Sequence, residues 1–155
     1  MTLIFALLLA LPWQFGTLDG PPAKAKQWVS YTSEQQSVSA GKQSMLELRF
    51  QVSDGFHVNS HTPKSELLIP TRVALEPAAG VKMGDANYPA GKEYSFSFDP
   101  KEKLDVYAQE FVVSVPVEAK PGTHEIAGAL RYQACDKAAC YPPKTLPLRV
   151  IFTAK

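Results

Sequence analysis

The sequence has little net charge, no long hydrophobic run and few cysteines. Its 155 residues include two cysteines and three histidines and carry a formal net charge of +1. So small a charge gives no support for nucleic acid or an acidic surface as a partner. The apolar run at residues 3–11 is too short to span a bilayer as a helix, which needs about 20 residues. No Ser-His-Asp arrangement, phosphate-binding glycine loop or carboxylate pair stands out, which leaves the cysteines as the strongest chemical signal.

The apolar run at residues 3–11 fits the hydrophobic region of a secretory signal peptide. A Gly-Pro-Pro stretch with two lysines follows at residues 20–26 and is typical of a linker. We therefore expect a signal peptide and linker at residues 1–25 and one exported domain at residues 26–155. A buried N-terminal strand is the alternative interpretation of the run. Export places the chain in an oxidising compartment, where a cysteine pair can cycle.

Turn-forming residues are abundant, with thirteen prolines and nine glycines, and they favour short strands over a helix bundle. Clear alternation of apolar and polar residues predicts four strands, at residues 46–52, 111–117, 126–132 and 146–152. Weaker patterns predict three more, at residues 28–32, 71–75 and 94–98. No segment of convincing length has the 3.6-residue period of a helix. About seven short strands predict an antiparallel β-sandwich.

Cys135 and Cys140 are separated by four residues and lie between the third and fourth clear strands, at the rim of the predicted sandwich. A disulfide closing so short a loop contributes only about 2 kcal/mol, against about 5 for a loop of ~100 residues. A pair that opens and closes easily suits thiol–disulfide exchange better than stapling. Pro142 and Pro143 donate no ladder hydrogen bonds, so pairing should lapse beside the loop and leave it accessible.

Two alternatives to exchange stay open. One is a static disulfide in a non-catalytic binding module of the immunoglobulin type. The other is a metal carrier in which His57 and His61, spaced H-x3-H, join Cys135 and Cys140 as a Cys2His2 set. The metal signal is weak, because side chains four apart on an extended segment lie ~13 Å from each other. The alternative to metal binding is that His61 is a solvated loop residue, because it precedes Thr62 and Pro63.

Two runs carry a family resemblance, Tyr-Gln-Ala-Cys at 132–135 and Cys-Tyr-Pro-Pro at 140–143. Together they resemble the active-site hairpin of the N-terminal (alpha) domain of the thiol:disulfide interchange protein DsbD family. The segments 54–61 and 68–71 are similar to that family as well, and so is the strand order from about residue 28 to 152. The resemblance implies an immunoglobulin-like antiparallel β-sandwich in the periplasm. It also implies that the domain takes electrons from a thioredoxin-like donor and reduces disulfide isomerases or cytochrome c maturation proteins.

The resemblance assigns roles to particular residues. The second cysteine, Cys140, forms mixed disulfides with partners, and the first, Cys135, resolves them. An aromatic cap loop shields the pair, and the matching region supplies Phe96 or Phe98 as the cap residue. Exchange between thiols needs no cofactor or metal.

Four further residues are expected around the pair. His57 matches a position that flanks the cysteines in the family, and Asn59 belongs to the same segment. Tyr132 lies on the apolar face of its strand and is expected in the core. Tyr141 is expected on the surface that docks partners, because aromatic side chains dominate interface energetics.

The familiar members of the family continue into a membrane electron-transfer domain and a thioredoxin-like domain, whereas this chain ends after the sandwich. We therefore expect its partners to be separate proteins, or the chain to be a fragment. The expected partners are thioredoxin-like periplasmic proteins and a membrane electron-transfer protein. We expect the chain itself to be a monomer.

Overall fold

The computed structural model describes residues 26–32 and 34–155, which form twelve β-strands and their connections. Across these residues there is no helix, and hence none long and apolar enough to cross a membrane. The expected signal segment at residues 1–25 lies outside the described part of the chain. The predicted all-β class is confirmed.

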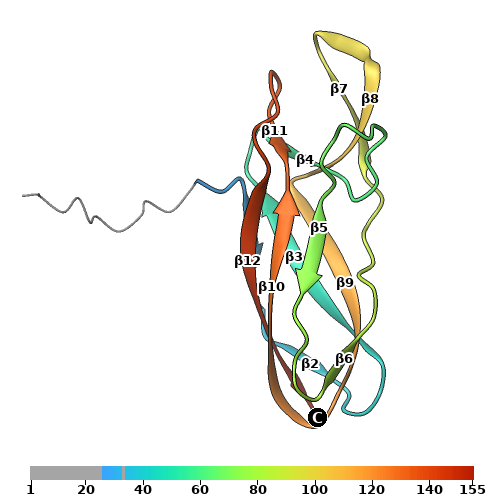
Figure 1. The fold of residues 1–155 in the computed structure, drawn as a ribbon, viewed down its shortest axis with the longest axis vertical. Coiled ribbons are helices and arrows are strands. Elements are labelled where there is room, and N and C mark those ends of the chain that lie inside the picture. Colours follow the sequence, from blue (N-terminus) through green and yellow to red (C-terminus); the bar gives the residue numbers. More distant parts are fainter. Residues whose placement is uncertain (1–25, 33) are drawn as a thin grey trace, which may run out of the picture.

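Two four-stranded sheets pack against each other (Figure 1). The first contains, in order, β1 (Val29–Thr32), β3 (Ser44–Val52), β9 (Glu110–Ala119) and β6 (Val81–Met83). The second contains, in order, β2 (Gln36–Val38), β12 (Lys144–Ala154), β10 (Gly122–Tyr132) and β5 (Arg72–Leu75). Pairing is antiparallel except between β2 and β12, which run parallel. This arrangement is the predicted immunoglobulin-like sandwich.

A third sheet, which we call the end sheet, lies at the end of the sandwich opposite the C-terminus (Figure 1). Its strands are, in order, β11 (Ala134–Cys135), β4 (His57–Asn59), β8 (Asp99–Ala108) and β7 (Lys92–Phe96). The β7–β8 hairpin projects beyond the sandwich close to the loop that follows β11 (Figure 1). The end sheet therefore brings three segments that are distant in sequence, β4, the β7–β8 hairpin and β11, to one end of the molecule.

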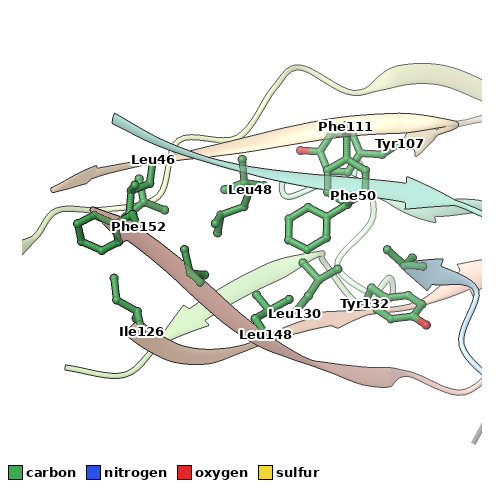
Figure 2. Close-up of a cluster of buried hydrophobic side chains, with 14 of the residues drawn as sticks. Leu46, Leu48, Phe50, Tyr107, Phe111, Ile126, Leu130, Tyr132, Leu148 and Phe152 are labelled. Carbon is green, nitrogen blue, oxygen red and sulfur yellow. The ribbon is translucent and has the colours of Figure 1, made fainter. Parts of the chain in front are cut away.

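The core forms between the facing sides of the two large sheets (Figure 2). In β3 every second residue is buried, so Leu46, Leu48 and Phe50 point inward while their neighbours face outward. β10 and β12 supply Leu130 and Phe152 from the opposite side. Period-2 alternation is the pattern that buries one face of a strand, and it fixes these strands in register.

The four clear strands are confirmed and extend slightly beyond their predicted ends, as β3, β9, β10 and β12. The weaker predictions correspond to β1, β5 and β7, but β7 ends at Phe96 rather than continuing to Phe98. Ser97 and Phe98 form the turn into β8 instead. The two phenylalanines therefore do not share one strand face, and their surroundings differ.

Candidate redox site

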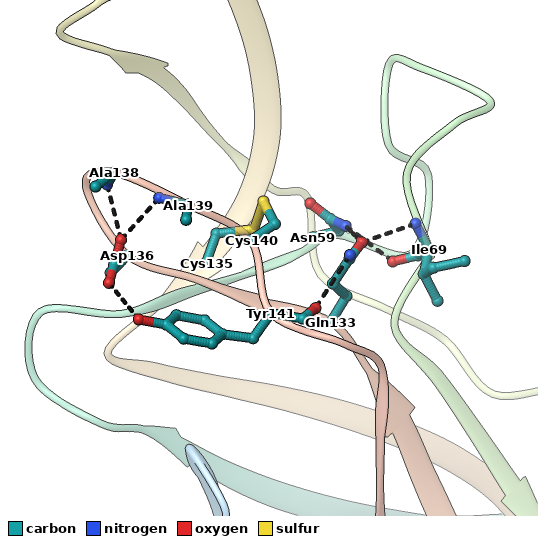
Figure 3. Close-up of a disulfide and its surroundings, with 9 residues drawn as sticks. All are labelled: Asn59, Ile69, Gln133, Cys135, Asp136, Ala138, Ala139, Cys140 and Tyr141. Carbon is teal, nitrogen blue, oxygen red and sulfur yellow. Dashed lines mark hydrogen bonds between the residues drawn. A yellow bond between two sulfur atoms is a disulfide. The ribbon is translucent and has the colours of Figure 1, made fainter.

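The two cysteines form a disulfide in the segment that connects β10 to β12 (Figure 3). The sulfurs are 2.03 Å apart, and the two Cα atoms are 3.9 Å apart. Cys135 lies in β11, the edge strand of the end sheet, and its register partner on β4 is His57. Cys140 forms an isolated antiparallel bridge with Cys135. The disulfide thus closes a four-residue loop at the tip of a hairpin.

The two halves of the disulfide differ in exposure. Cys135 is 0% exposed, whereas Cys140 is an exposed residue. Exchange requires a thiolate to reach one sulfur of a disulfide, and its rate depends on access to that sulfur. Cys140 is therefore the half of the disulfide open to an incoming protein, with Cys135 behind it.

Cys135 belongs to a small hydrophobic cluster separate from the main core. Its buried members besides Cys135 are Phe96, Leu104 and Val106 of the β7–β8 hairpin. Leu68 and Tyr94 pack against the cluster from outside. The hairpin therefore covers the inner cysteine with apolar side chains.

The two cap candidates occupy different environments. Phe96 is 7% exposed and lies within the cluster that contains Cys135. Phe98 is 67% exposed at the turn of the hairpin, where its ring stacks on that of Phe96 with centroids 4.9 Å apart. Phe96 is thus the phenylalanine packed with the cysteine pair, and Phe98 covers Phe96.

His57 is buried next to Cys135. Its ring centroid is 4.0 Å from that of Tyr94 and 6.0 Å from that of Phe96, and its Nε2 has no hydrogen-bond partner among the described residues. Burial lowers the pKa of His57 below its ordinary value, and the negative charge of Asp136 opposes part of that shift. The site therefore places a neutral imidazole behind the inner cysteine at neutral pH.

Asn59 lies two residues along β4 and connects three segments through its side-chain amide. Its Nδ2 donates to the carbonyl of Ile69 at 3.0 Å and to Oε1 of Gln133 at 3.1 Å. Gln133 also accepts from the amide of Ile69 and donates from Nε2 to the carbonyl of Tyr141 at 3.2 Å (Figure 3). Gln133 was not among the residues predicted for the site. Its sequence signal is its place in the Tyr-Gln-Ala-Cys run at 132–135, as the polar residue between β10 and β11.

Asp136 organises the loop between the cysteines. Its Oδ1 accepts from the amides of Ala138 and Ala139, and its Oδ2 accepts from the hydroxyl of Tyr141 (Figure 3). The bond from Tyr141, followed by those from the two amides, holds the pKa of Asp136 below its usual value. The same bond raises the pKa of Tyr141. Asp136 is therefore ionised at neutral pH and Tyr141 is not.

The two predicted tyrosine neighbours differ in burial, although both contact Trp28. Tyr132 is fully buried in the sandwich, where its hydroxyl accepts from the amide of Trp28 and donates to Oε1 of Gln27. Tyr141 is half-buried, with its ring 4.7 Å from that of Trp28 and 5.9 Å from that of Phe56. Tyr132 thus anchors the start of the domain, and Tyr141 anchors the cysteine loop.

The Cys2His2 arrangement is not assembled. The ring of His61 stacks on Tyr88 with centroids 3.7 Å apart, and its Nδ1 lies 3.1 Å from the carbonyl of Thr71. Within residues 26–32 and 34–155, no group of three or more His, Cys, Asp or Glu side chains is placed to hold a metal ion. The structure therefore gives the metal-carrier alternative no support.

Comparison with known proteins finds similar sequences. Residues 25–150 match the family described as thiol:disulfide interchange protein DsbD, N-terminal. The thiol:disulfide interchange protein DsbD of Haemophilus ducreyi is 25% identical over 146 residues, which are 93% of this chain and 22% of that protein. The chain therefore spans less than a quarter of the length of that relative.

Solved structures give matches at lower identity. The N-terminal periplasmic domain of ScsB from Proteus mirabilis has a TM-score of 0.53 and 13% identity, covering 79% of this chain and 44% of that chain. The reduced DsbD N-terminal domain of Neisseria meningitidis has a TM-score of 0.47 and 20% identity, covering 75% of this chain and 86% of that chain. The first of these likenesses supports the sandwich fold.

Proposed function

Because the chain belongs to the family of N-terminal domains of the thiol:disulfide interchange protein DsbD, we propose that it exchanges electrons with other proteins through Cys135 and Cys140. The observation that carries this proposal is the unequal exposure of the pair. Cys140 is open to an incoming protein, and Cys135 is buried directly behind it. An outer sulfur for attack and an inner thiol for resolution are what two-step exchange requires.

In the first half of the cycle the pair accepts two electrons. A thiolate of the donor attacks Sγ of Cys140, the Cys135–Cys140 bond breaks, and Cys135 leaves as a thiolate that takes up a proton. The donor's second thiolate then attacks the donor's first sulfur, which is bonded to Cys140 in the mixed disulfide. This step releases the thiolate of Cys140, which takes up a proton. The donor is left as a disulfide, and the chain as a dithiol.

The second half returns both electrons to an acceptor. The thiolate of Cys140 attacks the acceptor's disulfide and forms a mixed disulfide, releasing one acceptor thiol. The thiolate of Cys135 then attacks Sγ of Cys140, restores the original disulfide and releases the second thiol. The chain acts as a protein-disulfide reductase that needs no cofactor.

The proposed exchange partners are thioredoxin-like periplasmic proteins, supplied with electrons by a membrane electron-transfer protein. Family membership and the exposure of Cys140 support this assignment. Export of a domain at residues 26–155 behind a signal segment at residues 1–25 fits a chemistry that needs an oxidising compartment. The chain is proposed to work as a monomer.

The neighbours of the pair receive separate roles. Phe96 shields Cys135 as the cap, with Phe98 stacked over it. His57 and Asn59 hold the inner side of the site, and Tyr141 borders the docking surface at the loop base.

Single cysteine variants test the exchange mechanism. Cys135→Ala keeps the attacking thiol and removes the resolving one, so it should accumulate a mixed disulfide with an oxidised thioredoxin-like protein. Cys140→Ala should form no such adduct, because its remaining thiol is buried. Non-reducing gels and intact mass spectrometry measure the adducts, with the double variant as the blank. If Cys140→Ala alone forms the adduct, the two roles are reversed. If neither variant does, exchange with this class of partner is wrong.

A further inference from the structure

The loop between the cysteines is closed by hydrogen bonds that involve no sulfur. The amide of Asp136 donates to the carbonyl of Ala139 at 2.9 Å. In return, Oδ1 of Asp136 accepts from the amides of Ala138 at 2.7 Å and Ala139 at 2.9 Å (Figure 3). An Asp side chain that binds amides two and three residues ahead is a turn-forming device in its own right. The turn therefore has a source of order besides the disulfide.

Tyr141 fastens this turn to the sandwich. Its hydroxyl donates to Oδ2 of Asp136 at 2.7 Å, and its amide donates to the carbonyl of Ala134 at 2.8 Å. The ring packs against Trp28 and Phe56, which belong to the main core or pack against it. Both ends of the loop are thus held by contacts that involve no sulfur atom.

We propose that Asp136 and Tyr141 form a clasp that keeps the two cysteines adjacent in the reduced protein and so shifts the thiol–disulfide equilibrium toward the disulfide. This inference rests on the exchange function proposed above and concerns how that site is poised. Asp136 and Tyr141 act as positioning residues, since they work through the geometry of the loop.

The reason lies in the reduced state. When the disulfide is formed, the covalent bond itself holds the loop closed, and the clasp adds little restriction. After reduction the clasp alone limits the separation of the two thiols. Two groups held together react at a higher effective concentration than two groups on a loose loop, because less conformational freedom is lost when they join. Loosening the clasp should therefore favour the dithiol.

The negative charge of Asp136 also favours the disulfide over the dithiol. Its effect has to be distinguished from that of the hydrogen bonds that Asp136 makes in the clasp. An ionised carboxylate in the loop disfavours a nearby thiolate, which also disfavours the reduced form. Asp136→Asn removes the charge but retains an oxygen that can accept from the two loop amides. Asp136→Ala removes both. The exposed Lys137 lies in the same loop and forms no hydrogen bond or ion pair with the described residues, so Lys137→Ala alters loop charge without touching the clasp.

Equilibration with glutathione measures the effect directly, through the reaction of the dithiol with glutathione disulfide to give the protein disulfide and two glutathione thiols. Asp136→Ala should lower this equilibrium constant about tenfold, because the clasp no longer limits the separation of the two reduced thiols and their effective concentration falls. For a two-electron couple, tenfold is about 30 mV toward easier reduction. Tyr141→Phe should shift it in the same direction by less. Asp136→Asn should retain most of the wild-type value, and Lys137→Ala should not lower it.

Two results would overturn the clasp. One is an unchanged equilibrium constant in Asp136→Ala when its oxidised form melts like the wild type. The other is an equal loss in Asp136→Asn and Asp136→Ala, which assigns the effect to charge.

A second measurement uses NMR titration of the reduced wild-type protein. Its Asp136 pKa should stay below the ordinary value, because Tyr141 and the loop amides still donate to the carboxylate. A return to the ordinary value on reduction would show that the clasp opens with the disulfide. Neither measurement involves a partner protein, so failure of the exchange function leaves both interpretable, and failure of the clasp leaves the trapping result intact.

Discussion

Phe96 and Phe98 are two residues apart, yet only Phe96 reaches the cluster around the inner cysteine. Their separation by the β7–β8 turn is the cause, because β7 ends at Phe96 and the chain reverses through Ser97 and Phe98. A buried aromatic ring excludes reagents from Cys135, whereas a ring exposed at the turn leaves the path to this cysteine unchanged. A cap that limits access to Cys135 has to be part of the packed cluster, which favours Phe96.

Phe96→Ala should accelerate alkylation of the reduced Cys135 by a small thiol reagent, because the cluster over this cysteine loses its largest buried member. Phe98→Ala is the matched control, since it deletes an equal volume from the exposed turn and should alter the rate little. Stopped-flow or mass-spectrometric alkylation rates at fixed pH give the comparison.

Stability has to be measured beside these rates, since removing a buried Phe costs about 3–5 kcal/mol. Rates are compared only under conditions where both variants are folded by circular dichroism. A faster reaction in Phe98→Ala than in Phe96→Ala would transfer the cap role to Phe98.

At the scale of elements, β10 links the sandwich to the redox site, because it pairs with β12 and β5 and then runs into β11. Gly128 is the register partner of Leu75 in β5. A Cβ placed on Gly128 would lie 2.5 Å from the carbonyl oxygen of Ala74 and 3.1 Å from Cα of Leu75. Backbone atoms of a paired strand cannot move aside without breaking the ladder. Glycine is therefore needed there for close packing.

Gly128→Ala should lower the free energy of unfolding by about 1–3 kcal/mol, the usual range for overpacking. Urea denaturation followed by tryptophan fluorescence measures the loss. Gly84→Ala is the matched control, because its nearest neighbour is a side-chain atom, Cγ of Pro116 at 3.1 Å. The control should cost less than Gly128→Ala. Equal losses would mean that strand approach at Gly128 is not the cause.

The same elements show what the sequence can predict. Strands with one buried and one exposed face, such as β3, have a period-2 pattern and were predicted. β4 was not, because all three of its residues are buried and no alternation exists to detect. β8 was missed for the opposite reason, since Asp99 to Lys103 are all exposed in the projecting hairpin. A sequence pattern reveals a strand through the contrast between its two faces, which is absent from β4 and from the first half of β8.

The candidate site also contains features that the sequence predicts and contacts that it does not predict. The cysteine hairpin was found because its residues are contiguous in sequence. The contact between Asn59 and Gln133 joins positions 74 residues apart, and no local pattern encodes it. The bond between Asp136 and Tyr141 is local, but it depends on the loop conformation rather than on spacing. Such contacts require the folded chain.

At the scale of the whole molecule, the hydrophobic interior is divided in two. The main core lies between the large sheets, and the smaller cluster around Cys135 lies under the β7–β8 hairpin. Cys135 and Cys140 are only five positions apart in sequence, so their disulfide constrains the unfolded chain little. The sandwich should therefore stay folded when the disulfide is reduced, with only a limited loss of stability, as a domain that cycles requires.

Reduction should leave a folded sandwich with a single cooperative melting transition. The chain-entropy model gives a loss of about 2 kcal/mol for so short a loop, which lowers the melting temperature of a domain this size by about 5–10 °C. Circular dichroism melts with and without a phosphine reductant measure it, and Cys135→Ala/Cys140→Ala serves as a reductant-free control. A small domain that depends on its disulfide loses 2–5 kcal/mol or fails to fold when reduced. Loss of the cooperative transition would therefore contradict a cycling pair and favour a binding module held by a structural disulfide.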